Sequence, residues 1–290
     1  MRIAISAGDP RGIGPEIVTK ALADSRISGR CDFVVVGPTG AGVEIHESIG
    51  EWKGTGAADA GRLAGLAIER AVQMAMNGDV RGIVTAPIDK AALAAGGFDY
   101  PGHTEMLAAL TGTDVAMMLA SDKLRVVLAT THIALKDVVG YITHQAIVSA
   151  ANVTRKGLQE WFGIHEPRIA LCALNPHAGD GGRFGLEDQT VLTPAAMAAG
   201  IAGPFPADTV FVRAMRGEFD AVIAPYHDVG MTAIKVASFG SAVNVTLGLP
   251  FPRTSPDHGT ALDIAGLGKA DPSSFIEAIL LCCRIADRAR

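Results

Sequence analysis

The chain has 290 residues, of which 49% are hydrophobic and 19% are charged, and its formal net charge at pH 7 is −5. This composition supplies a large core and excludes an intrinsically disordered chain. The sequence contains no run rich in Lys and Arg and no apolar stretch of the ~18 residues that a transmembrane helix needs, so we expect neither a nucleic-acid nor a membrane partner.

Short apolar runs alternate along the chain with longer helical patterns, and this alternation predicts βαβ units on a largely parallel sheet. The expected strands are residues 3–7, 33–36, 82–85, 116–119, 125–129, 169–174, 221–224 and 242–246. The expected helices are residues 15–23, 58–77, 104–110, 144–162, 187–199, 260–265 and 273–285. The Gly-rich segment 37–55 is interpreted as a surface excursion. Because no low-complexity linker divides residues 1–290, we expect two interleaved α/β lobes with the active-site cleft between them.

The first motif, residues 8–16 (GDPRGIGPE), follows a strand and opens a helix. It has neither the spacing of the dinucleotide-binding Gly-x-Gly-x-x-Gly fingerprint nor a Gly-Lys-Ser/Thr phosphate loop. A simple turn and an active-site wall both remain possible for it.

A second motif, residues 100–105 (YPGHTE), precedes another expected helix. Thr104 can cap that helix, and the exposed N–H groups of a helix start attract an anion, to which His103 would add a donor. A pocket for phosphate or carboxylate and an ordinary helix cap are both consistent with this pattern.

Three histidines each follow an apolar run, at the positions where strands end: His132, His177 and His227. Strand ends of an open α/β sheet converge on the crevice where ligands bind. Three imidazoles there could hold one divalent metal and leave a coordination position for substrate. Taken singly, each histidine would more often be a satisfied residue of the core or its rim.

Two carboxylates lie near these histidines in sequence. Asp228 follows His227 directly and could orient it or act on a substrate hydroxyl, and Asp208 supplies a second carboxylate in a segment rich in Pro and Gly. Two carboxylates near a metal can divide the roles of base and orienting group. Each alone would more often be a helix cap or a turn residue.

Three polar residues, Lys235, Asn244 and Arg253, lie in a stretch that is otherwise rich in small and apolar side chains. Arg253 precedes an expected turn at residues 254–256, where its guanidinium suits a bidentate clamp on carboxylate or phosphate. Lys235 could instead extend its amine to solvent.

The four cysteines are Cys31, Cys172, Cys282 and Cys283. Their low number favours free thiols that act as small apolar side chains in a reducing compartment. The N-terminus enters directly as a strand rather than as a signal peptide, so we expect a cytoplasmic protein.

The segments 8–16, 102–105, 131–132, 175–179, 226–230, 244–250 and 253–270 together resemble the 4-hydroxythreonine-4-phosphate dehydrogenase (PdxA) family of vitamin B6 biosynthesis, in order and over almost the whole chain. The Gly- and Asp-rich stretch 257–272 also resembles the adenine-recognition loop of the isocitrate and isopropylmalate dehydrogenases. The resemblance implies their fold, a two-lobed α/β/α architecture with an interwoven, largely parallel sheet, and it implies a homodimer with each active site built from both chains.

The same resemblance implies roles for individual residues. Metal ligands would be His132, His177 and His227, and substrate contacts would be His103, Thr104, Lys235, Asn244 and Arg253. The active-site carboxylates would be Asp208 and Asp228, with Lys235 as a third catalytic group. Cofactor contacts would be His258, Gly259, Thr260, Ala261, Asp263 and Asp271. The cofactors implied are NAD or NADP and a divalent metal, for which three imidazoles favour Zn²⁺ over Mg²⁺, Mn²⁺ or Co²⁺.

The expected reaction is oxidation of the secondary hydroxyl of a phosphorylated four-carbon hydroxy acid, followed by decarboxylation of the 3-oxo acid. Oxidation of D-threonate or D-erythronate 4-phosphate, or of a cis-dihydrodiol carboxylate, is the alternative. A metal-dependent hydrolase or aldolase would use the same histidines and carboxylates. A non-catalytic phosphosugar-binding protein would need no three-histidine site.

Overall fold

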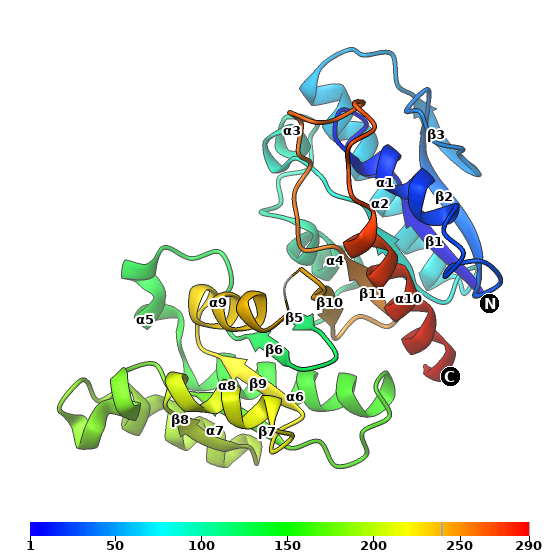
Figure 1. Cartoon of the computed structure of the whole chain (residues 1–290). Coiled ribbons are helices and arrows are strands. Elements are labelled where there is room, and N and C mark those ends of the chain that lie inside the picture. Colours follow the sequence, from blue (N-terminus) through cyan, green and yellow to red (C-terminus); the bar gives the residue numbers. More distant parts are fainter. Residues whose placement is uncertain (239, 290) are drawn as a thin grey trace. The chain divides into compact units, whose positions relative to one another are not determined.

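The computed structural model describes residues 1–238 and 240–289, which form two compact units. The first unit comprises Met1–Thr113, Val243–Val245 and Leu249–Arg290, and the second comprises Asp114–Ala242 and Thr246–Gly248. Both units are mixed α/β, and their described strands pair mostly in parallel, so the expected fold class is confirmed (Figure 1). Antiparallel pairing occurs at two described places, between β10 and β11 and between β5 and β6.

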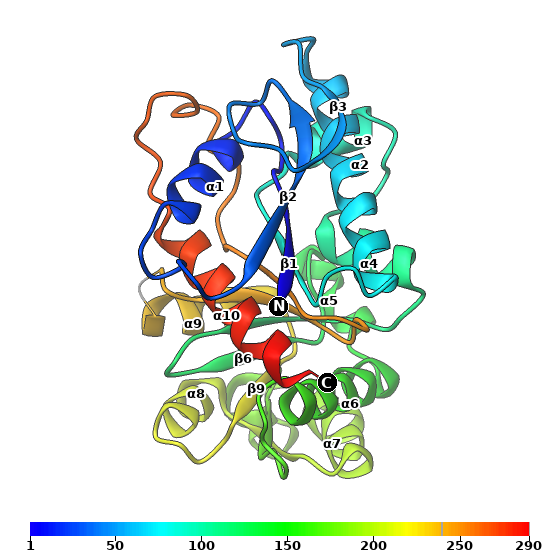
Figure 2. The same cartoon turned by 90° about the vertical axis from the view of Figure 1, so that its right-hand side faces the viewer.

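The first unit arranges its strands in the order β3-β2-β1-β4-β11-β10. Its elements are β1 (Arg2–Ser6), α1 (Gly14–Leu22), β2 (Asp32–Thr39), β3 (Glu47–Glu51), α2 (Ala57–Met76), β4 (Ile83–Thr85), α3 (Lys90–Ala95), α4 (His103–Thr111), β10 (Val243–Leu247), β11 (Arg253–Ser255) and α10 (Ser273–Arg288). The crossover from β1 to β2 runs one way along the sheet and that from β3 to β4 runs the other way. Because such crossovers are right-handed, α1 and α2 lie on opposite faces. Helix α10 packs beside α1 (Figure 2).

The second unit has the strand order β5-β6-β9-β7-β8. Its elements are β5 (Ala116–Ala120), β6 (Arg125–Leu128), η1 (Leu135–Asp137), α5 (Val138–Tyr141), α6 (His144–Glu160), β7 (Ile169–Cys172), η2 (Pro176–Gly182), η3 (Asp188–Leu192), α7 (Thr193–Ala199), β8 (Ala202–Phe205), α8 (Ala207–Met215), β9 (Ala221–Ala224) and α9 (His227–Ser238). The same handedness places α6 and α7 on one face and α8 on the other. Side chains of α8 and α9, such as Phe211 and Ile234, share one buried cluster with β6 and β9.

All eight expected strands are present, with ends that differ by a few residues. The interpretation of segment 37–55 as a surface excursion is wrong in part, because β2 continues to Thr39 and β3 pairs in parallel with it. The expected turn after Arg253 is also wrong. Residues 253–255 form the buried strand β11, between β4 and β10. The short strand β8 was not expected.

Six of the seven expected helices are present, and the one expected at residues 260–265 is wrong. That segment forms turns, and Ala261 has a φ of 41° that no right-handed helix contains. Four helices were not expected, namely α3, α5, α8 and α9. In α9 the glycine that weakens the helical pattern has a packing role, because a Cβ on Gly230 would lie 2.7 Å from Leu128 and 2.9 Å from Ala224.

The expectation of four free thiols is wrong for one pair. Cys31 at the start of β2 and Cys283 in α10 form a disulfide with a Cα–Cα distance of 6.6 Å, across a sequence separation of 252 residues. Sequence spacing could not show it, because the crossovers of the first unit bring the two residues together. Cys172 and Cys282 are free and buried. No helix within the described residues is long and apolar enough to span a membrane.

A single glycine sets the contact between α2 and α3. A Cβ added to Gly61 would overlap the backbone of Ala92, which cannot move without displacing α3. We expect Gly61→Ala to destabilise the protein by about 2 kcal/mol, as overpacked cores do. Thermal unfolding checks this, with Gly140→Ala as the control because nothing lies within 4 Å of the Cβ it would add. Equal melting temperatures for the two variants would show that α3 is free to shift.

Candidate active site

A cationic cluster lies in the first unit, around the buried Arg253 of the interior strand β11. Arg253 is only 1% exposed, and it donates a hydrogen bond to the Thr85 hydroxyl at the end of β4. The positive charges of Arg253 and of Lys90, the first residue of α3, both act on His103 at the start of α4. Two consecutive helices and a strand distant in sequence therefore bring basic side chains together, of which Arg253 is buried and Lys90 is exposed.

Some polar atoms at this cluster are buried without a hydrogen-bond partner. They are Nε2 of His103 and Oε2 of Glu105, both on α4. Oδ1 of Asn244 on β10, the strand next to β11, is also buried without a partner. Buried polar atoms are nearly always satisfied in native proteins, so such a group of exceptions indicates that a ligand completes the site. Thr104 lies within the first turn of α4 rather than capping it, because the cap position is Gly102.

The pKa values follow from this environment. Burial, with the positive charges of Arg253 and Lys90, holds the pKa of His103 well below 6.5, so the imidazole is neutral at pH 7. Burial lowers the pKa of Arg253 to about 9. Both shifts show that burial disfavours a further positive charge here, and the contributions of Arg253 and Lys90 to the shift of His103 show a positive local field that favours an anion.

The second unit brings two of the three expected metal ligands together. The ring centroids of His132 and His227 are 5.6 Å apart. Nδ1 of His227 lies 2.7 Å from Oδ1 of Asp228, so that carboxylate orients the ring and leaves Nε2 as the atom for a ligand. Thr131 and Tyr226 help these residues line a small cavity of about 110 Å³.

The third expected ligand, His177, is not part of that pair. It is exposed, and its ring lies 6.4 Å from that of Phe184. Within the described part of the chain, no three His, Cys, Asp or Glu residues are close enough to hold a metal ion. One copy of the second unit therefore presents two imidazoles and an orienting carboxylate.

The remaining candidates of the second unit are exposed side chains on helices. Asp208 lies in the first turn of α8, and Lys235 lies on α9. Their roles in the reaction stay predictions.

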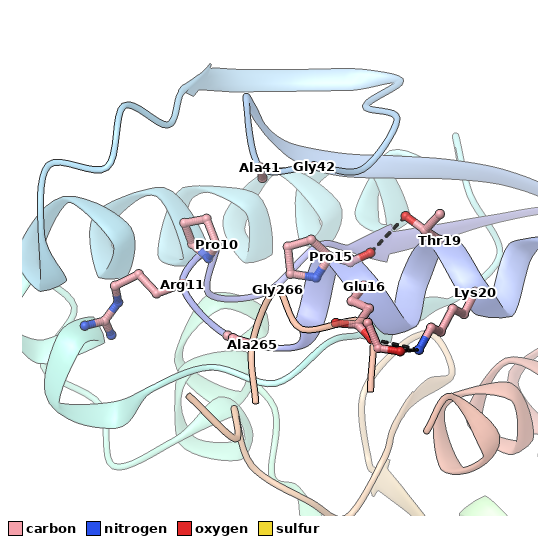
Figure 3. Close-up of a pocket in the computed structure, with 12 residues that line it drawn as sticks. Pro10, Arg11, Pro15, Glu16, Thr19, Lys20, Ala41, Gly42, Ala265 and Gly266 are labelled. Atoms are coloured by element: carbon pink, nitrogen blue, oxygen red, sulfur yellow. Dashed lines mark hydrogen bonds and ion pairs between the residues drawn. The ribbon is translucent and has the colours of Figure 1, made fainter. Parts of the chain in front are cut away.

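The Gly-rich stretch expected to contact a cofactor forms a long irregular loop in the first unit. Its Thr260 carbonyl accepts a hydrogen bond from the Ile13 N–H ahead of α1. Beside this loop lies a cavity of about 500 Å³, lined by Pro10, Arg11, Gly12, Pro15, Glu16, Thr19, Lys20, Ala41, Gly42, Ala265, Gly266 and Gly268 (Figure 3). Of the six expected cofactor contacts, which are His258, Gly259, Thr260, Ala261, Asp263 and Asp271, none lines this cavity.

Ion pairs fix the wall of this cavity. Lys20 bonds Oε1 of Glu16 at 2.7 Å and the carbonyls of Gly268 and Ala270, which ties the loop to α1 (Figure 3). Arg11 pairs with the fully buried Asp9. The motif at residues 8–16 therefore forms a wall of a cavity.

Lys90 and Glu105 were not among the expected site residues. The sequence held a signal for Lys90, since Asp89-Lys90 follows the strand end at Thr85 by only a few residues. Nothing in the sequence pairs it with His103, which is brought close by the packing of α2 against both α3 and α4.

Comparison with known proteins identifies relatives over the full length. The family model described as "Pyridoxal phosphate biosynthetic protein PdxA" matches residues 21–282. A 4-hydroxythreonine-4-phosphate dehydrogenase of Desulfosudis oleivorans is 43% identical over 96% of this chain and 94% of that protein. A D-threonate 4-phosphate dehydrogenase of Salmonella typhimurium is 40% identical over 98% of both chains. The crystal structure of a 4-hydroxythreonine-4-phosphate dehydrogenase from Klebsiella pneumoniae superposes with a TM-score of 0.88, at 40% identity over 98% of this chain and 99% of that one.

The depressed pKa of His103 makes stability depend on pH. Below pH 6.5 the unfolded chain binds a proton at this residue that the folded chain does not, so stability falls as the pH drops through that value. The difference in unfolding free energy between wild type and His103→Gln should therefore change by about 1.4 kcal/mol per pH unit below 6.5. Denaturant unfolding from pH 7 to pH 5 measures it, with the exposed His165→Gln as the control. A difference that is constant with pH would contradict a neutral His103.

Proposed function

This chain belongs to the PdxA family of pyridoxal phosphate biosynthetic proteins, and on that premise we propose that it oxidises the secondary hydroxyl of a phosphorylated four-carbon hydroxy acid, 4-hydroxythreonine 4-phosphate or a close analogue. The 3-oxo acid that results loses CO₂, because the electrons of the breaking bond flow into the ketone. The protein is accordingly an oxidoreductase of vitamin B6 biosynthesis.

The cationic cluster is the observation that supports a phosphorylated substrate. A phosphate brings negative charge and several acceptor oxygens, which suit the guanidinium of Arg253, the amine of Lys90 and the imidazole of His103. Asn244 adds an amide on the neighbouring strand β10. An uncharged polyol would form no ion pair with Arg253 or Lys90, so these cations favour a substrate that carries a phosphate.

The histidine pair fits a divalent metal. His227 is oriented by a carboxylate on its far nitrogen, which is the usual arrangement of a metal-binding histidine, and His132 faces it. A divalent ion held there, with Zn²⁺ favoured by imidazole ligands, would lower the pKa of a substrate hydroxyl toward neutrality. Asp228 or Asp208 would accept the hydroxyl proton, and Lys235 would stabilise the enolate left by decarboxylation.

NAD or NADP, as the hydride acceptor, would occupy the cavity beside α1. Its volume of about 500 Å³ falls in the ~300–1,000 Å³ range of small-molecule sites. The loop that lines it contains the stretch resembling an adenine-recognition loop, and it contributes Ala265, Gly266 and Gly268 to the lining in place of the six expected contacts. The tie from Lys20 to Gly268 and Ala270 would hold this loop in place for the dinucleotide.

The working form in this proposal is a cytoplasmic homodimer. Each second unit presents His132 and His227 together but keeps His177 exposed on its own loop. A second copy of the chain could supply the missing imidazole, so that each metal site takes ligands from both subunits.

Oxidation of D-threonate 4-phosphate is the second candidate. It is favoured by the relative of that name, which is nearly as similar to this chain as those named for 4-hydroxythreonine 4-phosphate. Both substrates carry the terminal phosphate for which the cationic cluster is suited. The two substrates differ at carbon 2 and not at the phosphate, so groups other than Arg253 would distinguish them.

The substrate class is tested by a panel of phosphorylated four-carbon hydroxy acids and one cis-dihydrodiol dicarboxylate, with NAD or NADP, read as NADH or NADPH absorbance. We expect kcat/KM for the phosphorylated acids to be at least ~100-fold higher, because a ring carboxylate brings less negative charge and fewer acceptor oxygens to Arg253, Lys90 and His103 than a terminal phosphate does. His103→Gln should raise KM for the phosphorylated acids. Full activity in protein verified to be metal-free, or turnover of the dihydrodiol alone, would overturn the proposal.

Shared metal sites are tested with mixed dimers. His132→Ala and His177→Ala should each lose most bound metal and lower kcat by about 10²–10⁴-fold, as loss of a catalytic group does. If His132 and His177 of one site come from different chains, a mixture of the two variants, unfolded and refolded together, regains activity because one site of each mixed dimer is intact. A mixture as inactive as its parents would show that both ligands come from the same chain.

A further inference from the structure

The loop that carries His177 has an unusual backbone. Five consecutive residues, 177–181, have φ between 44° and 81°, and three of them, His177, Ala178 and Asp180, bear a Cβ. The left-handed region is unfavourable for such residues because the Cβ crowds the following carbonyl oxygen. A strained segment of this kind persists only where its surroundings hold it in place.

The surroundings that hold it are two carboxylates at the start of η3. Asp188, 1% exposed, accepts a hydrogen bond from the N–H of Leu174 at 2.8 Å on one oxygen and from the N–H of Asn175 at 3.0 Å on the other. Glu187 accepts a third bond, at 2.8 Å, from the side-chain amide of Asn175. The segment is thus fixed two residues before His177.

The strained turn also packs directly against Asp188. A Cβ on Gly179, in the middle of the turn, would lie 3.0 Å from the Gly185 carbonyl and 3.8 Å from the Asp188 carboxylate. The N–H of Phe184 bonds back to the Gly179 carbonyl at 3.1 Å. The buried carboxylate therefore holds the residues that precede the turn and lies close to its middle.

We infer that Asp188 is a positioning residue that, with Glu187, keeps the left-handed turn in the conformation that presents His177 for metal binding. The inference rests on the proposed function of His177 as a ligand. An amide in place of the carboxylate offers one acceptor oxygen instead of two, so Asp188→Asn would leave one of the two N–H groups facing an NH₂ group. The turn could then relax to right-handed backbone and move the imidazole.

The first measurement is metal affinity. Zn²⁺ or Co²⁺ titrated into the metal-depleted full-length protein should bind at least ~10-fold more weakly to Asp188→Asn than to wild type, as when other groups that orient a ligand are changed. Glu187→Gln, which keeps an acceptor for Asn175, should stay within about twofold of wild type on the same reasoning.

A rescue variant separates positioning from general destabilisation. Glycine adopts the left-handed region without crowding, so Ala178→Gly should raise the melting temperature by ~2 °C in an otherwise wild-type protein. In the Asp188→Asn background it should restore most of the lost metal affinity, because the turn then needs less support. A merely structural defect at Asp188 would not be repaired in this way.

The matched control lies at the other end of β7. Asp220 accepts a hydrogen bond from the N–H of Arg168 at 2.8 Å, just before β7 begins. Asp188 accepts its hydrogen bonds from N–H groups just after β7 ends. Asp220→Asn should lower the melting temperature but leave metal affinity unchanged.

Trypsin cleavage after the exposed Arg183 gives a readout that needs no metal. It should be several-fold faster in Asp188→Asn than in wild type or Asp220→Asn, because cleavage follows local opening of the turn. If His177→Ala loses metal while Asp188→Asn matches wild type in affinity and cleavage, the positioning role is overturned and the proposed function stands. If His177→Ala keeps its metal, the ligand role fails, and the cleavage rate alone decides whether Asp188 holds the turn.

Discussion

The organisation of the first unit depends on one buried charge. Arg253 lies on an interior strand at 1% exposure, and burial lowers its pKa to about 9. Removing a guanidinium from water costs far more free energy than a single neutral hydrogen bond returns. The neighbouring His103 is held neutral by the same burial and by the positive charges of Arg253 and Lys90. The positive charges of Arg253 and Lys90, beside a neutral imidazole, favour an anionic ligand at this cluster.

In the second unit the constraint is different, because the imidazoles that follow the strand ends must be oriented. His227 begins α9 directly after β9, and Asp228 orients it. His177 instead lies on a turn whose backbone is unfavourable, and the buried carboxylate of Asp188 holds the residues just before that turn. In both places a carboxylate lies beside the group to be oriented. Asp228 acts through the imidazole ring of His227, and Asp188 acts through the backbone before His177.

Much of the fold could be predicted from the pattern of apolar residues in the sequence. Buried parallel strands appear as short apolar runs, so β1 or β9 could be placed within a few residues. Elements that depend on packing could not be placed. Gly230 lowers the helical propensity of α9, yet the helix forms because the glycine lets it approach β6 and β9 closely. The sequence predicts a turn after Arg253. The strand β11 forms there instead because β4 and β10 supply partners on both sides.

The sequence by itself determined the family, the residue types of the site and the alternation that makes an α/β fold, because these depend on which side chains occur and in what order. It identified His132, His177 and His227 as one set. Only the tertiary structure decided that two of them meet within one unit while the third stays exposed on a strained turn. Only the tertiary structure showed that the charge of Lys90 acts on His103 and that Cys31 forms a disulfide with Cys283. The physical reason is that periodicity reports on local backbone and burial, whereas pairings between distant residues are set by crossover handedness and close packing, which leave no local trace in a single sequence.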